Sequence, residues 1–268
     1  EHEFKNGIAM EAGAKASTVN TRNEIIQYIG SNDQNIAYDS TLSNDFEYQE
    51  DVYAAYISGV KKYKSWDFDL GLRAEYTASK GYSHTIDSTN VNNYFNLFPN
   101  LSVKKTLSKN LDISAAYSRR LSRPAYWQVN PFKIQESEFS YWSGNPYLTP
   151  QYSNNYTLNA SIQKSVFLTL GYTHTTDAIS KVILQDNNDQ TITNTTINLD
   201  DIYNFNFSAV VPIPITKWWL LNFDGNVFYN KQVSPGQQEE INLEQWTYKI
   251  NLRNEITLPK KYKMEVYG

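Results

Sequence analysis

Strict alternation of apolar and polar residues decides the fold in the stretch 66–77, which reads WDFDLGLRAEYT. One set of alternate positions holds Trp66, Phe68, Leu70, Leu72, Ala74 and Tyr76. The positions between them hold Asp67, Asp69, Gly71, Arg73, Glu75 and Thr77. A period of two is typical of a β-strand, whereas an amphipathic helix would need apolar residues at i, i+3, i+4 and i+7. The stretch is therefore predicted to be a strand with one apolar face and one polar face.

Similar stripes recur along the chain, and they are long. They comprise Leu111/Ile113/Ala115/Tyr117, Tyr156/Leu158/Ala160/Ile162, Tyr203/Phe205/Phe207/Ala209/Val211, Trp219/Leu221/Phe223/Val227/Tyr229 and Tyr248/Ile250/Leu252. Strands of soluble proteins usually have about 5–6 residues, but several stripes here alternate over roughly 12–14 residues. About 13 residues at ~3.3 Å each, tilted by ~40°, rise ~33 Å, which spans the ~25 Å apolar band of an outer-membrane barrel.

The connections between the stripes alternate between short and long. Short turns are expected near 62–65, 108–110, 164–165, 214–217 and 259–262, and long polar segments over 23–46, 80–91, 124–152, 181–194 and 231–241. A repeat of roughly 45–55 residues would also fit a β-propeller blade, but a blade needs four short strands and each repeat here has two long ones. Short turns at one rim and long loops at the other are typical of bacterial outer-membrane barrels.

About eleven strands are predicted. They cover 7–20, 46–62, 66–80, 93–107, 110–123, 153–164, 166–181, 195–213, 217–231, 242–258 and 262 onward. Bacterial single-chain barrels have even strand numbers, so the odd count suggests that residues 1–268 are part of one larger outer-membrane β-barrel domain. The fold class is therefore all-β, an antiparallel transmembrane β-barrel segment.

Composition excludes several other classes. Aromatic residues make up 15% of the 268 residues although the mean hydropathy is −0.58, so aromatic and polar side chains must occupy different faces of the same elements. No apolar run is long enough for a transmembrane helix, and Glu1-His2-Glu3 does not resemble a signal peptide. A formal net charge of −4 argues against a nucleic-acid partner. We find no catalytic, cofactor or metal-binding motif, and the three histidines lie far apart in the sequence.

The most specific segment lies between Tyr117 and Leu158. It contains YSRRLSRP at 117–124, NPF at 130–132 and GNPYLTP at 144–150. With FEYQE at 46–50 and GLRAEYT at 71–77, this series resembles the barrel of TonB-dependent outer-membrane receptors, in particular the large receptor-like family of Bacteroidetes. The resemblance implies a plug domain that is absent from this sequence, and a chain that forms about half of a ~22-stranded barrel.

Within that segment we single out two groups of residues. Trp127, Tyr141, Trp142 and Tyr147 are candidates for ligand binding, because aromatic side chains on a loop at a barrel mouth either stack on a solute or pack the loop. Arg119, Arg120, Arg123 and Asn145 are candidate anchors that hold the loop to the lumen, since arginine is a fork-shaped donor for carboxylates and carbonyls. The whole connection from Arg123 to Gln151 is expected to fold inward over the lumen.

The leading functional hypothesis is the barrel wall of an outer-membrane importer of a scarce solute such as a siderophore, cofactor, glycan or peptide. The resemblance implies outer-membrane lipid, the TonB complex acting through the plug, and a surface lipoprotein as partners. Two alternatives stay open: a barrel enzyme of the outer membrane, and a soluble aromatic-rich glycan-binding β module. Fold alone does not choose among them.

The alternation also predicts which way side chains face. We expect the lipid face to contain Leu70, Leu72, Leu111, Ile113, Leu158, Phe205, Phe223 and Ile250. We expect the lumen face to contain Asp69, Arg73, Asp112, Asn159, Asn206, Asp224 and Arg253. The first and last strands of the sheet are expected not to pair with each other.

Overall fold

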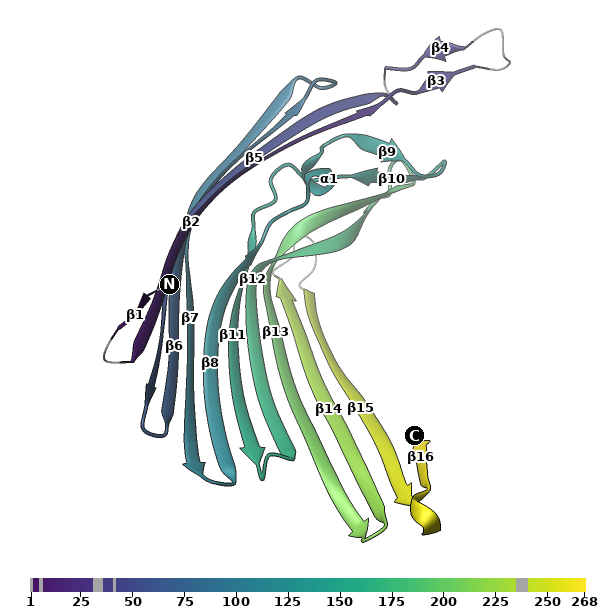
Figure 1. The fold of residues 1–268 in the computed structure, drawn as a ribbon. Coiled ribbons are helices and arrows are strands. Elements are labelled where there is room, and N and C mark those ends of the chain that lie inside the picture. The colour runs from purple at the N-terminus through teal and green to yellow at the C-terminus, as the bar shows by residue number, and fades with distance from the viewer. Residues whose placement is uncertain (1, 5–6, 31–35, 41, 235–240) are drawn as a thin grey trace.

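The computed structural model describes residues 2–4, 7–30, 36–40, 42–234 and 241–268. Most of them form one curved and open sheet whose long strands are all antiparallel to their neighbours (Figure 1). Its strands, in spatial order, are β1 (His2–Glu3), β2 (Ile8–Ile25), β5 (Asn44–Tyr63), β6 (Trp66–Ser83), β7 (Ser88–Ser108), β8 (Leu111–Ser122), β11 (Gln151–Ile162), β12 (Val166–Asp186), β13 (Thr191–Thr216), β14 (Trp219–Ser234), β15 (Ile241–Thr257) and β16 (Lys263–Tyr267). β1 has only two residues and lies beside β2. Without it, eleven described strands remain in this series, as predicted.

The two rims of the sheet differ, as expected. At the short-turn rim, β5 and β6 are joined through Lys64 and Ser65, and β7 and β8 through Lys109 and Asn110. The 3₁₀ turn η1 (Pro259–Lys261) leads from β15 to β16. At the opposite, long-loop rim several strands run farther than predicted. Only 84–87 separate β6 from β7 and 187–190 separate β12 from β13, because Thr- and Asn-rich segments continue the pairing after the apolar alternation has ended.

Cross-strand partners confirm the predicted facing. In an antiparallel pair, residues directly opposite each other share a face. Leu70, Leu101, Tyr117, Tyr156, Tyr172, Phe205, Tyr229 and Trp246 are successive partners across eight strands. All eight residues predicted to face lipid share this face, and all seven predicted lumen residues lie on the other one.

Aromatic rings mark both borders of the apolar face. From β8 to β15 the rings of Tyr117, Tyr156, Tyr172, Phe205, Tyr229 and Trp246 form a row of neighbours 4.6–6.2 Å apart. Ten residues separate Tyr229 from Trp219 on β14, which corresponds to a height of ~25 Å for a strand tilted by ~40°. The rows therefore enclose a band as tall as the apolar core that such barrels present to lipid.

The connection from β8 to β11, residues 123–150, is here called the strap. It contains α1 (Tyr126–Val129), β9 (Lys133–Gln135) and β10 (Ser140–Ser143). β10 pairs with β9 and runs parallel to the upper end of β13, with Tyr141 opposite Thr193. Figure 1 shows the strap on the inner side of the curved sheet, at the long-loop rim. The hairpin of β3 (Tyr28–Ile29) and β4 (Ala37–Tyr38) extends from the same rim, between β2 and β5.

The few fully buried apolar side chains lie near this rim. They are Phe46, Val52, Phe132, Leu148, Ala178 and Leu199. Elsewhere both faces of the sheet are exposed in this structure, and the helices in the described part of the chain are too short to cross a membrane. The core of the molecule is therefore the contact between the strap and the inner wall.

Candidate functional site

Arg123 joins the start of the strap to the wall. It directly follows β8, and its guanidinium forms an ion pair with Glu75 on β6 and donates to Thr77 Oγ1 at 3.0 Å. Glu75 is 3% exposed and also forms an ion pair with Arg73. Because Arg73, Glu75 and Thr77 occupy alternate positions of one strand, they all face the inner side. The buried Glu75 carboxylate, between Arg73 and Arg123, therefore anchors the start of the strap to the wall.

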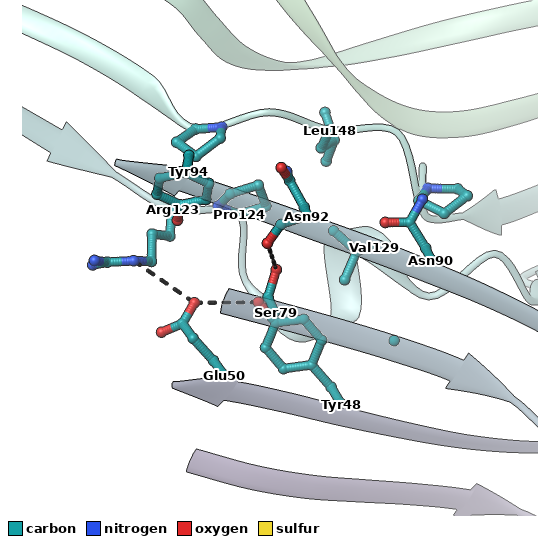
Figure 2. Close-up of a pocket in the computed structure, with 13 residues that line it drawn as sticks. Tyr48, Glu50, Ser79, Asn90, Asn92, Tyr94, Arg123, Pro124, Val129 and Leu148 are labelled. Atoms are coloured by element: carbon teal, nitrogen blue, oxygen red, sulfur yellow. Dashed lines mark hydrogen bonds and ion pairs between the residues drawn. The ribbon is translucent and has the colours of Figure 1, made fainter. Parts of the chain in front are cut away.

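A second carboxylate lies beside the first. Glu50 on β5 is 3.7 Å from Nε of Arg123, and its other neighbour is the hydroxyl of Tyr48, which donates to it at 3.2 Å (Figure 2). Burial, together with the nearby Glu50 charge, raises the pKa of Tyr48. The phenol therefore stays protonated and remains a donor at physiological pH.

The strap is packed onto the wall rather than suspended above it. The cavity between them measures only about 20 Å³ and is lined by the wall residues Asn92 and Tyr94 and by Pro124, Val129 and Leu148 of the strap (Figure 2). That volume accommodates about one water molecule. Leu148 is 2% exposed. The space under the strap is hence a packed contact, too small for a solute.

Local hydrogen bonds give the strap its shape. The Asn145 N–H donates to the Gln128 carbonyl at 2.6 Å, and its side-chain Oδ1 accepts from the Tyr147 N–H at 3.0 Å. Gly144 passes so close to α1 that a Cβ there would lie 2.4 Å from the Asn130 carbonyl oxygen. Only glycine fits at this crossing. The strap is consequently a folded unit, and Asn145 lies at its turn.

The four candidate ligand-binding aromatics take different positions. Trp127 of α1 and Trp142 of β10 lie together, with ring centroids 5.3 Å apart, and the ammonium of Lys181 on β12 is about 6 Å from both rings. Tyr141 lies beneath the ammonium of Lys133 at 4.1 Å. Tyr147 is 81% exposed and the structure shows no ring partner for it among the described residues. Two indoles and a lysine therefore form an aromatic and cationic platform, whereas Tyr147 stands apart.

The three candidate anchoring arginines separate as well. Only Arg123 contacts the wall of β5 and β6. Arg119 is the cross-strand partner of Asn154, which places it on the outer face of the sheet. Its guanidinium lies 5.0 Å from the ring of Tyr152. Arg120 has inward parity but is exposed, with no ion pair among the residues described. Alternation along β8 separates Arg119 from Arg120, whereas Arg123 follows the end of β8 and is no longer held to the period of the strand.

The chemistry available at this site is binding chemistry. The described residues contain no group of three His, Asp or Glu side chains arranged to hold a metal ion. His84 is paired with Glu47 at 3.3 Å, and His174 with Asp201. The platform offers stacking and one positive charge, and the wall beside it offers hydrogen bonds.

Comparison with known proteins identifies the family. A sequence profile described as the outer membrane protein β-barrel family matches residues 1–268. The chain belongs to this family. Its place is therefore the cell outer membrane, with the short-turn rim facing the periplasm and the long-loop rim facing outward. No curated protein sequence matches the chain.

Solved structures share the fold of this β-barrel. The copper transporter OprC superposes with a TM-score of 0.63 at 10% identity, over 97% of this chain and 45% of OprC. The siderophore receptor PiuA from Acinetobacter baumannii gives 0.57 at 14% identity, over 96% of this chain and 42% of PiuA. The ferric-catecholate import receptor Fiu from E. coli K12 gives 0.56 at 14% identity, over 97% of this chain and 41% of Fiu. The resemblance to outer-membrane receptor barrels is confirmed, and the chain spans less than half of each of these three proteins.

Three important residues of the site were not singled out from the sequence. Glu50 and Glu75 lie in the FEYQE and GLRAEYT stretches that carry the resemblance but were given no role of their own, and Lys181 carried no special signal. The contact between Glu75 and Arg123 joins residues 48 positions apart. One available signal was a carboxylate inside an otherwise regular strand, two positions from an arginine of the same face.

Proposed function

We propose that the chain forms part of the barrel wall of a TonB-dependent importer that takes up a scarce solute from outside the cell. Support comes from the family, from the fold shared with receptors and transporters, and above all from the strap packed against the inner wall at the outer rim. Because Arg123 holds the strap to the wall, the strap would cover part of the outer opening of the lumen. Solute would then pass beside the strap rather than beneath it, because the strap seals its own contact with the wall.

The platform of Trp127, Trp142 and Lys181 is the proposed first contact for the solute. Stacking on one exposed ring contributes about 0.5–1.5 kcal/mol beyond burial, and a nearby ammonium adds attraction for anionic solutes. A planar anionic solute would satisfy both groups. Two of the structural neighbours are a siderophore receptor and a copper transporter, so metal complexes are the first class of solute to test. Cofactors, glycans and peptides are the next classes.

Energy for uptake would come from TonB acting through a plug domain supplied by the complete receptor, and a surface lipoprotein is the further candidate partner.

The test compares uptake of a panel of labelled ferric siderophores, copper, cobalamin and oligosaccharides by three strains: the parent, a strain lacking this receptor and a strain lacking TonB. We expect one solute to be lost from both mutants. Uptake that disappears without the receptor but persists without TonB would contradict TonB dependence.

An aromatic variant of the complete receptor tests the platform. Replacing Trp127 and Trp142 together by alanine is expected to weaken solute binding by roughly 5- to 150-fold, because two stacking contacts of ~0.5–1.5 kcal/mol each are removed. Replacing Tyr28 and Tyr38 of the β3–β4 hairpin by alanine is the matched control, since they form an exposed ring pair 6.2 Å apart away from the strap. Equal affinity in both variants, with normal assembly, would restrict the strap aromatics to packing.

An enzymatic role has less support. The structural neighbours named above are receptors and transporters.

A further inference from the structure

An apolar groove crosses the lipid-facing surface where β2, β5 and β6 meet. Its volume is about 490 Å³, and its walls are formed by Met10, Ile57, Leu70 and Leu72. The floor is Gly59, the cross-strand partner of both Met10 and Leu70. A Cβ at Gly59 would come no closer than 3.7 Å to another residue, so the groove exists because this position lacks a side chain.

One lysine lines the periplasmic end of this groove, and a second lies near it on the same outer face. Lys61 lies two residues below Gly59 on the same outer face of β5. Lys105 on β7 is the partner of Trp66, and its ammonium is 4.4 Å from the centre of that ring. Within the part of the chain that the structure describes, neither ammonium forms an ion pair with a carboxylate.

The nearby carboxylates are on the other side of the wall. Asp67 and Asp69 alternate with Trp66 and Phe68, so they face the lumen, where Lys62 and Lys104 both lie opposite Asp67. The outer face at this rim is consequently positive, although the chain as a whole carries −4. Charges on the lumen side cannot neutralise it through direct contact.

The depth of these groups matches a lipid headgroup. Ten residues separate Trp66 from Tyr76 on β6, which places the two rings at opposite borders of the ~25 Å apolar band. Trp66 and Tyr63 therefore lie at the interface of the periplasmic leaflet, the depth at which aromatic belts meet headgroups. Lys105 is level with Trp66, and Lys61 lies opposite Phe68, two residues inside the band, from where its long side chain can extend to the headgroups. The groove continues from Lys61 into the acyl region.

We propose that this surface binds one anionic phospholipid of the periplasmic leaflet, with its phosphate between Lys61 and Lys105 and an acyl chain in the groove over Gly59. The occupant must be a lipid because this face lies in the outer membrane. An anionic headgroup fits best, since a zwitterionic lipid such as phosphatidylethanolamine brings an ammonium close to two unpaired lysines. The inference does not depend on which solute the receptor imports.

The test uses the complete receptor in detergent, titrated separately with phosphatidylglycerol and phosphatidylethanolamine and followed by native mass spectrometry. We expect wild type to bind phosphatidylglycerol more tightly. Changing Lys61→Gln and Lys105→Gln together is expected to weaken phosphatidylglycerol binding by about 30-fold, because each interfacial charge contributes about a factor of five. Phosphatidylethanolamine binding is expected to change little in this double variant.

Two further variants separate the groove from general charge. Gly59→Leu fills the groove without a backbone clash and is expected to weaken binding of both lipids. Lys164→Gln with Lys217→Gln removes two turn lysines of the same rim away from the groove and is expected to behave like wild type. The proposal is overturned by equal binding of the two lipids to wild type, by an equal loss in the control variant, or by a receptor dimer that Gly59→Leu dissolves. Heat-modifiable migration confirms that each variant has folded.

Discussion

At the scale of single residues, Glu75 is the group on which the strap most depends. Its carboxylate is buried between Arg73 and Arg123, and only Arg123 belongs to the connection that it holds. Removal of one partner from a buried ion pair costs about 3–5 kcal/mol. Because both arginines are partly exposed, we expect Glu75→Gln to lower the free energy of unfolding by only about 2 kcal/mol. The main effect should be a looser contact between the strap and the wall.

Hydrogen exchange of residues 123–150 in the complete receptor measures this loosening. Asp69→Asn provides the control, because Asp69 lies on the same face of the same strand and has no ion pair among the described residues. Faster exchange in Glu75→Gln alone is the expected result. Identical exchange in both variants would show that packing of Leu148, rather than the ion pair, holds the strap.

Arg22 and Asp45 predict a pH response at the outward tip of the β2–β5 pair. Arg22 donates to both carboxylate oxygens of Asp45, at 2.7 and 3.0 Å. This hydrogen bond holds the pKa of Asp45 below its ordinary value of 3.8. Because the folded-state pKa is the lower one, the pair stabilises the tip above pH 3.8 and its contribution is lost as the pH falls through the folded-state pKa.

Hydrogen exchange of 20–25 and 44–47 against pH tests this prediction. After correction for the intrinsic pH dependence of amide exchange, the wild-type tip is expected to lose protection on acidification below the ordinary aspartate pKa, whereas the protection in Arg22→Gln should stay constant. A step of equal size in the variant would assign the response to another carboxylate, with Glu47 the nearest candidate.

The candidate site could be predicted from the sequence only in part. The segment that carries it, 123–150, was identified from its prolines, arginines and aromatic residues, yet the pairing of Trp127 with Trp142 depends on α1 and β10, which are too short to leave a periodic signal. Lys181 was predicted as the last residue of the strand 166–181, but its contact with the two indoles left no signal in the sequence. Such contacts are set by tertiary packing, which alternation does not encode.

At the scale of elements, the alternation of apolar and polar residues predicted most of the strands, because lipid favours apolar side chains and the lumen favours polar ones. An unpaired charge on the lipid face costs about 2–4 kcal/mol near the bilayer centre, so each strand within the band must keep its period. Outside the band this demand ends, and there the predictions of strand ends were wrong: β13 begins at Thr191 rather than at 195.

Neighbouring positions on β15 test this facing directly. Leu252 is the partner of Phe223 on the lipid face near mid-band, and Asn251 is the partner of Asp224 in the lumen. Leu252→Arg is expected to destabilise the complete receptor by about 2–4 kcal/mol. Asn251→Arg should be nearly neutral, because its guanidinium points towards Asp224. Urea-induced unfolding in lipid vesicles measures both, and equal losses would contradict the assigned faces.

At the scale of the whole molecule, the two rims have different chemistry. The outward rim holds the strap, the platform and paired charges such as Arg22 with Asp45. The periplasmic rim holds short turns and lysines, two of which face lipid without a counter-charge. This difference is consistent with the two proposals, solute binding at the outward rim and phospholipid binding at the periplasmic rim.

The open edges of the sheet give the last prediction. β1 covers only the first residues of β2, which leaves the rest of that edge without a partner among the described residues, and β16 does not pair with β1 or β2. Within lipid every backbone N–H and C=O needs a partner, and an exposed edge also promotes aggregation. We therefore expect residues 1–268 expressed alone to aggregate, and the complete receptor to migrate as a heat-modifiable barrel in gel electrophoresis. A closed, heat-resistant monomer formed by residues 1–268 in detergent would contradict the proposal that further strands of the complete receptor close this wall.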